Sequence, residues 1–217
     1  MGRTSAALAI EPGAPLLVRR LPEGAQQAEG LIPLIRDLMA GADIDFVSLD
    51  RIAVSTGPGG FSGIRTGVAA ARGIGLAAGV PVVGATSFQI MAAAFEKDGP
   101  VPEAYGIAAP AGLSAVFCQI LAPGRTGLTE ILALPHSEAG AFFEGRTRVI
   151  AGPAAGPLSE AGYVSMPVRG AGIAPDAETL AGLAPELDPR RDLPSPYYVR
   201  PADARPQTGH LIPRKEE

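Results

Sequence analysis

The stretch Gly57-Pro58-Gly59-Gly60-Phe61-Ser62-Gly63-Ile64-Arg65-Thr66-Gly67 decides the class of fold. The apolar segment before it, residues 51–56, is typical of a buried β-strand, and the Ala- and Gly-rich residues 62–78 predict a helix. The positions from Gly57 to Gly60 predict a turn between the two, because glycine adopts positive φ angles at little cost. A strand, a tight turn and a helix in this order indicate a βα unit of an α/β protein.

The residues ahead of this unit predict a hairpin and a helix. Residues 4–10 and 15–21 are short apolar segments around the turn signal Glu11-Pro12-Gly13, and apolar residues recur at helical spacing over 26–40. After the unit, residues 80–84 predict a buried strand, and Ser87 is expected to cap a helix that ends near Phe95.

The second half of the chain predicts a smaller lobe. The expected strands are 105–109, 115–121, 127–134, 148–151 and 197–199, and the expected helices are 137–143 and 176–183. We therefore expect an N-terminal lobe over 1–98, a C-terminal lobe over 99–200 and a mobile tail over 201–217, which is polar and rich in proline.

The composition narrows the class of function. The net charge is -4, so the chain lacks the basic field that RNA-binding proteins use to neutralise phosphates, and RNA is expected to be reached only through a partner. Cys118 is the only cysteine and cannot form an internal disulfide, which fits the reducing cytoplasm. The uncharged residues 73–95 have the length of a membrane span, but Gly79, Pro81 and Gly84 interrupt them, so no span is expected.

The glycine-rich turn carries a family resemblance. Its residues match the pattern Gly-Pro-Gly-x-Phe-Thr/Ser-Gly-x-Arg-x-Gly, here Gly57, Pro58, Gly59, Phe61, Ser62, Gly63, Arg65 and Gly67. This resembles the signature of the bacterial tRNA threonylcarbamoyladenosine biosynthesis family known as TsaB or YeaZ. The ending 196–201 is similar to that family's Pro-x-Tyr-x-Arg, and the resemblance covers 4–122 well and 123–190 loosely. It implies a fold of the actin, Hsp70 and sugar-kinase type, with two RNase-H-like lobes.

The resemblance also implies a function and partners. A member of this family is a non-catalytic subunit of the complex that transfers a threonylcarbamoyl group to the adenosine next to the anticodon of tRNA. Its implied partners are the catalytic paralogue TsaD, in a heterodimer, and the ATPase TsaE. Alone it is expected to form a homodimer, and tRNA is reached only through the complex. No cofactor of its own is implied, and a nucleotide at the subunit interface is left open.

Catalytic residues are not expected in this chain. The catalytic relative holds its metal with a His-x-x-x-His pair on one helical face, whereas the two histidines here, His136 and His210, lie far apart. Many relatives open the second lobe with Ile-Asp-Ala-Arg, and Ala109-Pro110-Ala111-Gly112 takes that place here, so both charged groups are lost. We therefore expect a partner subunit without a metal site rather than an enzyme.

The turn allows other interpretations. It could bind phosphate at a helix N-terminus, but no Gly-Lys-Ser/Thr follows it and residues 52–95 offer no ribose-binding carboxylate near it. A hydrolase using Ser62 with His136 lacks the Gly-x-Ser-x-Gly elbow, and Ser62 is expected to cap its helix instead. The alternative function is a free-standing nucleotide-dependent enzyme of the sugar-kinase superfamily, although the chain shows only one phosphate-type loop.

The helix after the turn carries the predicted partner interface. Gly63, Gly67, Ala71 and Gly75 place a small residue at every fourth position, so they share one face. This face either packs closely on the protein's own sheet or forms a helix pair with the partner subunit. Arg65 lies at the unfavourable end of the helix dipole, so a carboxylate or carbonyl partner is expected for it.

The N-terminus is expected to lack a strand. Relatives have three strands before the first helix, whereas only two candidates precede Gln26. With the first, central strand missing, the sheet would split into two fragments with unpaired inner edges. In the other register, residues 8–11 take the central place and one hairpin strand is lost. We prefer the first, and then expect Met1 to be internal, with the native protein starting about ten residues upstream, enough for a strand and a turn.

Overall fold

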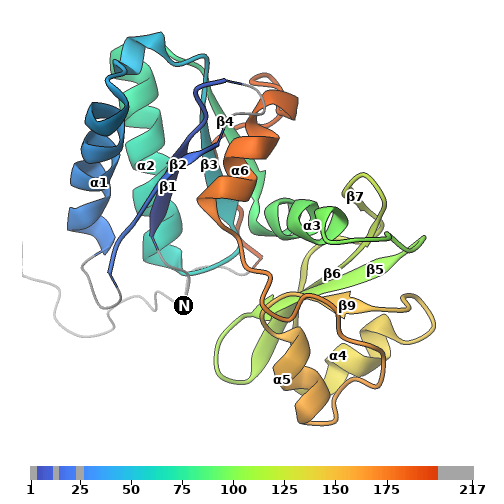
Figure 1. Ribbon diagram of the computed structural model, residues 1–217. Helices are drawn as coiled ribbons and strands as arrows, with labels where there is room; N and C mark the ends of the chain where they lie inside the picture. Colours follow the sequence, from blue (N-terminus) through green and yellow to red (C-terminus); the bar gives the residue numbers. More distant parts are fainter. Residues whose placement is uncertain (1–3, 12–14, 23–26, 200–217) are drawn as a thin grey trace, which may run out of the picture.

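The computed structural model describes residues 4–11, 15–22 and 27–199, and these residues form two lobes (Figure 1). The first lobe begins with an antiparallel hairpin of β1 (Ser5–Leu8) and β2 (Leu17–Arg20). Helix α1 (Gln27–Ala42) packs on this hairpin, with Leu34, Leu38 and Met39 buried, and a short 3₁₀ turn, η1 (Phe46–Ser48), follows. The predicted hairpin and first helix are confirmed.

The βα unit predicted from the glycine-rich stretch is present. Strand β3 (Ile52–Gly57), helix α2 (Phe61–Ala78) and strand β4 (Val82–Thr86) follow one another, and β3 pairs with β4 in parallel. Helix α3 (Ser87–Lys97) comes next and lies between the lobes. Its cap is Thr86, one residue before the expected Ser87, because Thr86 and Gln89 form a reciprocal capping box.

The second lobe is a small sheet covered on both faces. It contains β5 (Tyr105–Pro110), β6 (Ala115–Ala122), β7 (Thr126–Gly127), β8 (Leu132–Pro135) and β9 (Ile150–Ala151), with β6 beside β5, β7 and β8. One face packs on α4 (His136–Phe143) and α5 (Ala155–Glu160), and the other packs on the apolar side of α3. Helix α5 was not predicted, because it is short and interrupted by Pro157.

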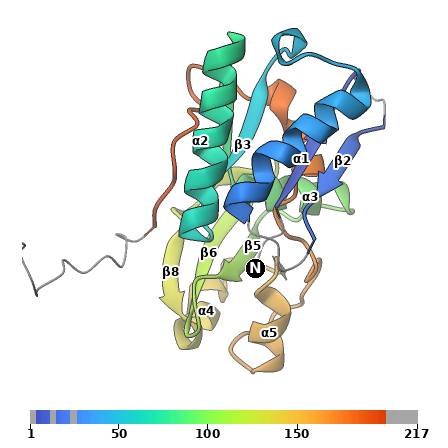
Figure 2. The ribbon, with the colours of Figure 1, turned by 90° about the vertical axis from the view of Figure 1, so that its left-hand side faces the viewer.

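The chain returns to the first lobe at its end. Helix α6 (Ala177–Leu183), capped by Asp176, packs against β1, β3 and α3, and η2 (Ala184–Glu186) follows. Residues 188–199 then run beside α2 (Figure 2). Within the expected C-terminal lobe over 99–200, α6 thus packs on elements of the first lobe, whereas Glu186 and Tyr197 also contact residues of the second lobe. The expected mobile tail, 201–217, lies outside the described residues.

The returning segment binds β3 and β4 through the backbone. The Gly84 N–H donates to the Asp192 carbonyl at 2.8 Å, and the Tyr197 N–H donates to the Thr56 carbonyl at 2.8 Å. A side chain at Gly84 would lie 2.6 Å from the Leu193 carbonyl oxygen, so glycine permits this close approach. The segment over 197–199 makes no regular strand, unlike the expectation, because these contacts are isolated rather than a ladder.

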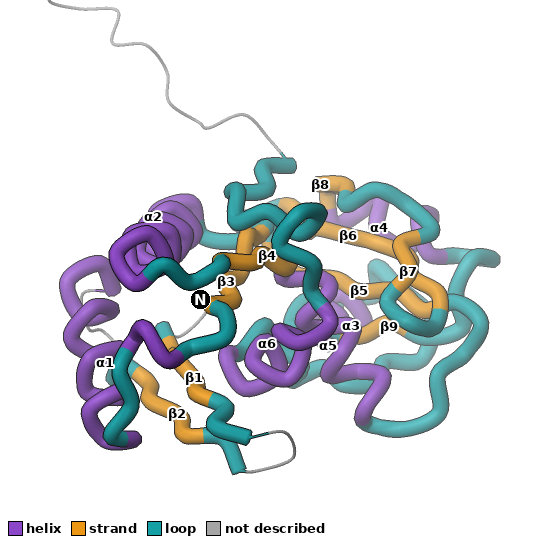
Figure 3. Tube along the Cα trace, turned by 90° about the horizontal axis from the view of Figure 1, so that it is seen from above, coloured by secondary structure: helices purple, strands orange, loops and turns teal. Residues whose placement is uncertain are grey.

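The described strands of the first lobe form two separate sheets. In the described part of the chain, β1 pairs only with β2 and β3 pairs only with β4, so no strand ladder joins the hairpin to the βα unit. Seen from above, β1 is the hairpin strand nearer to β3 (Figure 3). The expected absence of a central first strand stays a prediction, since the pairing shows only that these four strands form two separate ladders. Among the described helices, none is long and apolar enough to cross a membrane.

Candidate functional site

The turn that carries the family signature, Gly57 to Gly60, which we call the signature turn, begins with a glycine that has a positive φ angle. Gly57 has φ 95°, follows β3 and precedes Pro58 across a cis peptide bond. Other residues rarely adopt this φ angle, so glycine is favoured here, and an added Cβ atom would also lie 2.6 Å from the Ile64 Cδ1 atom. Gly60 has φ -61° and is the residue that caps α2, without a side-chain hydrogen bond. Ser62, expected at the cap, is the second residue of the helix instead.

Arg65 links the first turn of α2 to the C-terminal segment. Its Nε donates to the Tyr198 hydroxyl at 2.8 Å, and its guanidinium lies 3.8 Å from the centre of the Phe61 ring. The Phe61 and Tyr198 rings are 5.4 Å apart. The expected carboxylate or carbonyl partner is therefore wrong. A phenol oxygen and an aromatic face take that place, because the returning chain brings Tyr198 against the helix.

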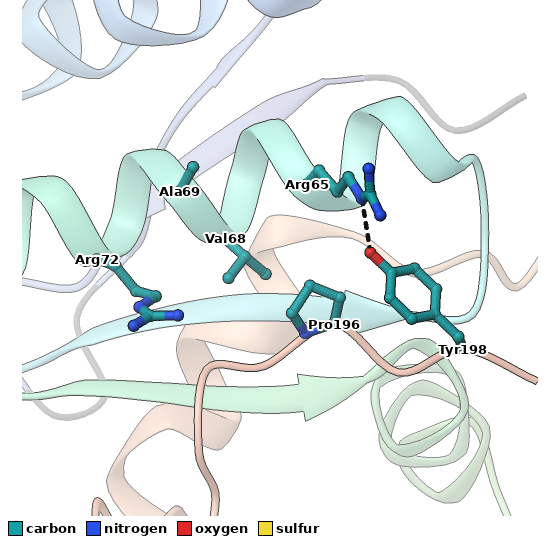
Figure 4. Close-up of a pocket in the computed structure, with 6 residues that line it drawn as sticks. All are labelled: Arg65, Val68, Ala69, Arg72, Pro196 and Tyr198. Carbon is teal, nitrogen blue, oxygen red and sulfur yellow. Dashed lines mark hydrogen bonds between the residues drawn. The ribbon is translucent and has the colours of Figure 1, made fainter. Parts of the chain in front are cut away.

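An open groove continues from this cluster along α2. It has a volume of about 400 Å³ and lies between α2 and the C-terminal segment (Figure 4), lined by Arg65, Val68, Ala69, Arg72, Pro196 and Tyr198. The structure shows no hydrogen-bond or ion-pair partner for the Arg72 guanidinium among the described residues. Two guanidinium groups beside an apolar floor can bind an acidic side chain, and no described His, Cys, Asp or Glu side chain lines the groove.

The outer face of α2 is unusually open for an apolar helix. Exposed residues recur at intervals of four, three and four positions, as Arg65, Ala69, Arg72 and Leu76, a spacing that places them on one face. Leu76 is 87 % exposed. Helix α1 packs beside α2 (Figure 2) and carries an exposed apolar residue of its own, Ile32, which is 42 % exposed. These exposed apolar side chains are the kind that a partner protein covers.

The predicted small-residue stripe faces mostly the other way. Ala71 and Gly75 are buried, and Gly67 lies over Val54 of β3. A side chain at Gly75 would meet the Val82 Cγ2 atom of β4 at 2.2 Å. Only Gly63, at the beginning of the helix, is exposed. The structure therefore favours packing on the protein's own sheet over the intersubunit contact, because α2 must approach β3 and β4 closely.

His136 and Cys118 lie on separate elements of the second lobe, α4 and β6. No set of three or more His, Cys, Asp or Glu side chains there could hold a metal ion. His136 begins α4 and lies beside Tyr163, with ring centres 5.9 Å apart, and His210 lies outside the described residues. Burial raises the pKa of the Cys118 thiol to about 12, so it remains protonated at neutral pH and is a poor nucleophile.

Comparisons with known proteins agree on one group of relatives. Residues 21–119 match the sequence model of the TsaD family, tRNA N6-adenosine threonylcarbamoyltransferase. The Escherichia coli K12 protein TsaB, a tRNA threonylcarbamoyladenosine biosynthesis protein, is 28% identical over 75 residues, which are 34% of this chain. The matched segment spans only 32% of the length of that relative.

Two solved structures from Pseudomonas aeruginosa share the fold. One, described as an uncharacterized protein with similarity to peptidase YEAZ, superposes with a TM-score of 0.70 at 23% identity, covering 90% of this chain and 94% of that one. The other, YeaZ, superposes with a TM-score of 0.68 at 24% identity, covering 89% and 93%.

Fold and sequence together place the chain among α/β proteins with a TsaD-type domain of the actin, Hsp70 and sugar-kinase class. Within that class, the chain is similar to TsaB in part of its sequence and to YeaZ in its fold.

Proposed function

We propose that this protein is a non-catalytic subunit of the complex that transfers a threonylcarbamoyl group to the adenosine next to the anticodon of tRNA. It acts by binding and supporting a catalytic paralogue of the TsaD type. The observation that carries this proposal is the similarity of the chain to both TsaB and the TsaD family model. Paralogues with similar lobes can pair through equivalent helices, in the way that identical subunits do.

The outer face of α1 and α2 supports the proposal as a binding surface. Leu76 and Ile32 are exposed apolar side chains on the neighbouring helices α2 and α1, and the Arg72 guanidinium of α2 has no partner among the described residues. An apolar centre with arginine at its edge is a common composition for protein interfaces. We assign the contact with the TsaD-type partner to this face, in place of the buried stripe at Ala71 and Gly75.

The other partners follow from the same proposal. The chain is proposed to meet the ATPase TsaE within the complex, to form a homodimer through the same face when alone, and to reach tRNA only as part of the complex, in the cytoplasm. A net charge of -4 supports the indirect contact with tRNA, since phosphate binding favours basic surfaces. Direct binding measurements would test whether a nucleotide binds at the subunit interface.

A matched pair of substitutions tests the partner surface. Leu76→Glu places a charge at the proposed contact, whereas Leu113→Glu makes the same change in the β5–β6 turn, where Leu113 is 102 % exposed. Both side chains are exposed, so both variants should fold as the parent does. We expect Leu76→Glu to weaken binding to the cognate TsaD protein by about tenfold or more, as for the centre of an interface, and Leu113→Glu to leave it unchanged.

Binding is measured by titration calorimetry, with circular dichroism as the check on folding. Equal affinities for the two variants would show that the α2 face is not the contact. Absence of any binding by the parent chain would reject the subunit proposal itself and favour the free-standing nucleotide-dependent enzyme of the sugar-kinase superfamily. That alternative predicts nucleotide turnover by the chain alone.

A further inference from the structure

The groove between α2 and the C-terminal segment carries two arginine side chains with unused donors. Arg65 and Arg72 lie at its two ends, with Val68 between them (Figure 4). The Arg65 Nε–H donates to the Tyr198 hydroxyl. For the terminal amino groups of Arg65, and for the whole Arg72 guanidinium, the structure shows no partner among the described residues. No described Asp or Glu lines the groove either, so two positive charges lie there without a counter-charge from that part of the chain.

The floor between the two arginines is apolar. Val68 is only 3 % exposed, because it packs with Val54 and Ala71 in a core cluster of the first lobe. Pro196 borders the floor from the C-terminal segment. A ligand in the groove therefore contacts hydrocarbon in its middle and a guanidinium group at each end.

One of the two guanidinium groups is held in place. Arg65 lies 3.8 Å from the centre of the Phe61 ring, and its Nε is 2.8 Å from the Tyr198 hydroxyl. The remaining N–H groups of an arginine form a planar fork that fits the two oxygens of a carboxylate. Because Arg65 is already positioned, a carboxylate that binds it loses less side-chain entropy than one that binds a free arginine.

The spacing of the two arginines predicts the conformation of the ligand. They are seven positions apart, so they share one face of α2 and are separated by about 10 Å along its axis. In a β-strand, side chains on one face are about 7 or 13 Å apart. In a polyproline II helix, which has three residues per turn, residues three positions apart share a face at about 9 Å. Two carboxylates at that spacing match the two arginines.

The size of the groove also suits an extended segment. Its volume of about 400 Å³ is near the lower end of the range for ligand sites, about 300–1,000 Å³. A helix with its side chains is larger, about 10–12 Å across. Polyproline II peptides are commonly recognised in grooves bordered by aromatic rings, and the Phe61 and Tyr198 rings border the Arg65 end. The net charge of -4 disfavours a nucleic acid as the occupant.

We propose that this groove binds an extended acidic segment of a partner protein, in the polyproline II conformation, with two carboxylates three positions apart. One carboxylate pairs with Arg65 and the other with Arg72, and the two residues between them lie on Val68 and Pro196. The inference goes beyond the proposed function and does not rest on it, because charge and spacing select the segment, whichever protein carries it.

The test titrates the full chain with three tetrapeptides, acetylated and amidated so that only side chains carry charge. The probe is Glu-Pro-Pro-Glu. Gln-Pro-Pro-Gln removes both charges, and Glu-Glu-Pro-Pro keeps the composition and net charge but places the carboxylates at adjacent positions. NMR signals of the Val68 and Ala69 amides and the Arg65 Nε–H report binding. We expect saturable binding of the probe, with affinities lower by about tenfold for the Gln peptide and about fivefold for the adjacent pair.

A matched pair of substitutions locates the site on the protein. Arg72→Gln removes one charge of the groove, and Arg148→Gln makes the same change at an exposed position of the second lobe. Arg72 is substituted because Arg65 also holds the C-terminal segment. We expect Arg72→Gln to weaken binding of the probe by about fivefold and Arg148→Gln to leave it unchanged. Higher salt should weaken binding of the probe to the parent chain, because the groove is open to solvent.

Four outcomes would overturn the proposal. Equal affinities for the three peptides would exclude recognition by charge and spacing, and equal affinities of the two variants would place the site elsewhere. Tighter binding of a single-stranded RNA tetranucleotide at the same signals would assign the groove to phosphates. Shifts of these signals with rising protein concentration and a dimer mass would assign it to a second copy. None of these outcomes affects the contact with a TsaD-type partner tested at Leu76, so the two proposals fail separately.

Discussion

Arg65 shows how one residue of the signature connects distant parts of the chain. A positive charge in the first turn of a helix opposes the helix dipole, typically by 0.3–1 kcal/mol. Here the guanidinium stacks on Phe61 and its Nε–H donates to Tyr198, which lies 133 residues further along the chain. The aromatic contact and the hydrogen bond offset the dipole and attach the C-terminal segment to α2.

Substitutions at the two ends of this contact separate the aromatic stacking from the hydrogen bond. Arg65→Lys keeps the charge but loses the planar stack on Phe61, so we expect a loss of about 0.5–1 kcal/mol in the free energy of unfolding. Tyr198→Phe keeps the ring and removes one exposed hydroxyl, so its loss should remain within about 0.5 kcal/mol. Urea denaturation measures both. A larger loss for Tyr198→Phe than for Arg65→Lys would show that the hydrogen bond, and not the stacking, holds the segment.

The partner of Arg65 could not be predicted from the residues around it. The sequence places Arg65 at a helix start, which correctly indicates the need for a compensating contact. It does not show that residues 188–199 return to α2, because that path depends on where α6 packs. Ser62 illustrates a smaller limit, since the helix begins at Phe61 and the cap therefore moves to Gly60. Local patterns leave such boundaries uncertain by a residue or two.

Helix α2 contains glycines with opposite surroundings only two positions apart. Gly75 faces the sheet, where an added Cβ would be 2.2 Å from the Val82 Cγ2 atom and 2.9 Å from the Val80 carbonyl oxygen. At Gly73 an added Cβ would meet nothing within 4 Å. Glycine within a helix is destabilising relative to alanine unless close packing requires it. Close packing therefore explains Gly75 but not Gly73.

Alanine at these two positions should change stability in opposite directions. Gly75→Ala overpacks the contact with β4, and we expect it to destabilise the protein by about 1–3 kcal/mol. Gly73→Ala should stabilise it by about 0.5–1 kcal/mol, because the open side of the helix gains only the better propensity. Thermal unfolding of the two variants beside the parent checks this. A stabilising Gly75→Ala would mean that α2 does not sit closely on β4 in solution.

The elements were predictable where the pattern is local. The hairpin, α1, β3, α2 and the strands β5 and β6 all lie close to their predicted positions, because each has a clear apolar period between turn residues. The direction of the small-residue stripe was not predictable. Spacing shows that Gly67, Ala71 and Gly75 share a face, but a face of small residues can suit a sheet or another helix equally well.

At the scale of the whole molecule, the two lobes are joined by more than one segment. Glu96 of α3 accepts hydrogen bonds from the Tyr105 hydroxyl at 2.7 Å and from the Arg125 N–H at 2.9 Å, and the Arg125 side chain pairs with Glu186 of η2. Contacts over such sequence separations leave no periodic signal. The two-lobe class of fold was therefore predicted from the family signature, whereas the return of α6 to the first lobe required the structure.

The isolated chain is expected to show neither threonylcarbamoyl transfer to tRNA nor peptidase activity, and to bind no stoichiometric zinc. The sequence has no His-x-x-x-His pair, His136 lies beside a tyrosine ring at the start of α4, and burial keeps the Cys118 thiol protonated, with its pKa raised to about 12. Transfer and proteolysis assays on the lone chain, with metal analysis of the same preparation, provide the test. The reconstituted complex with the cognate TsaD protein is the positive control for transfer. Turnover that stays with the purified chain and is lost in Ser62→Ala would contradict the subunit proposal and restore the hydrolase interpretation of the signature turn.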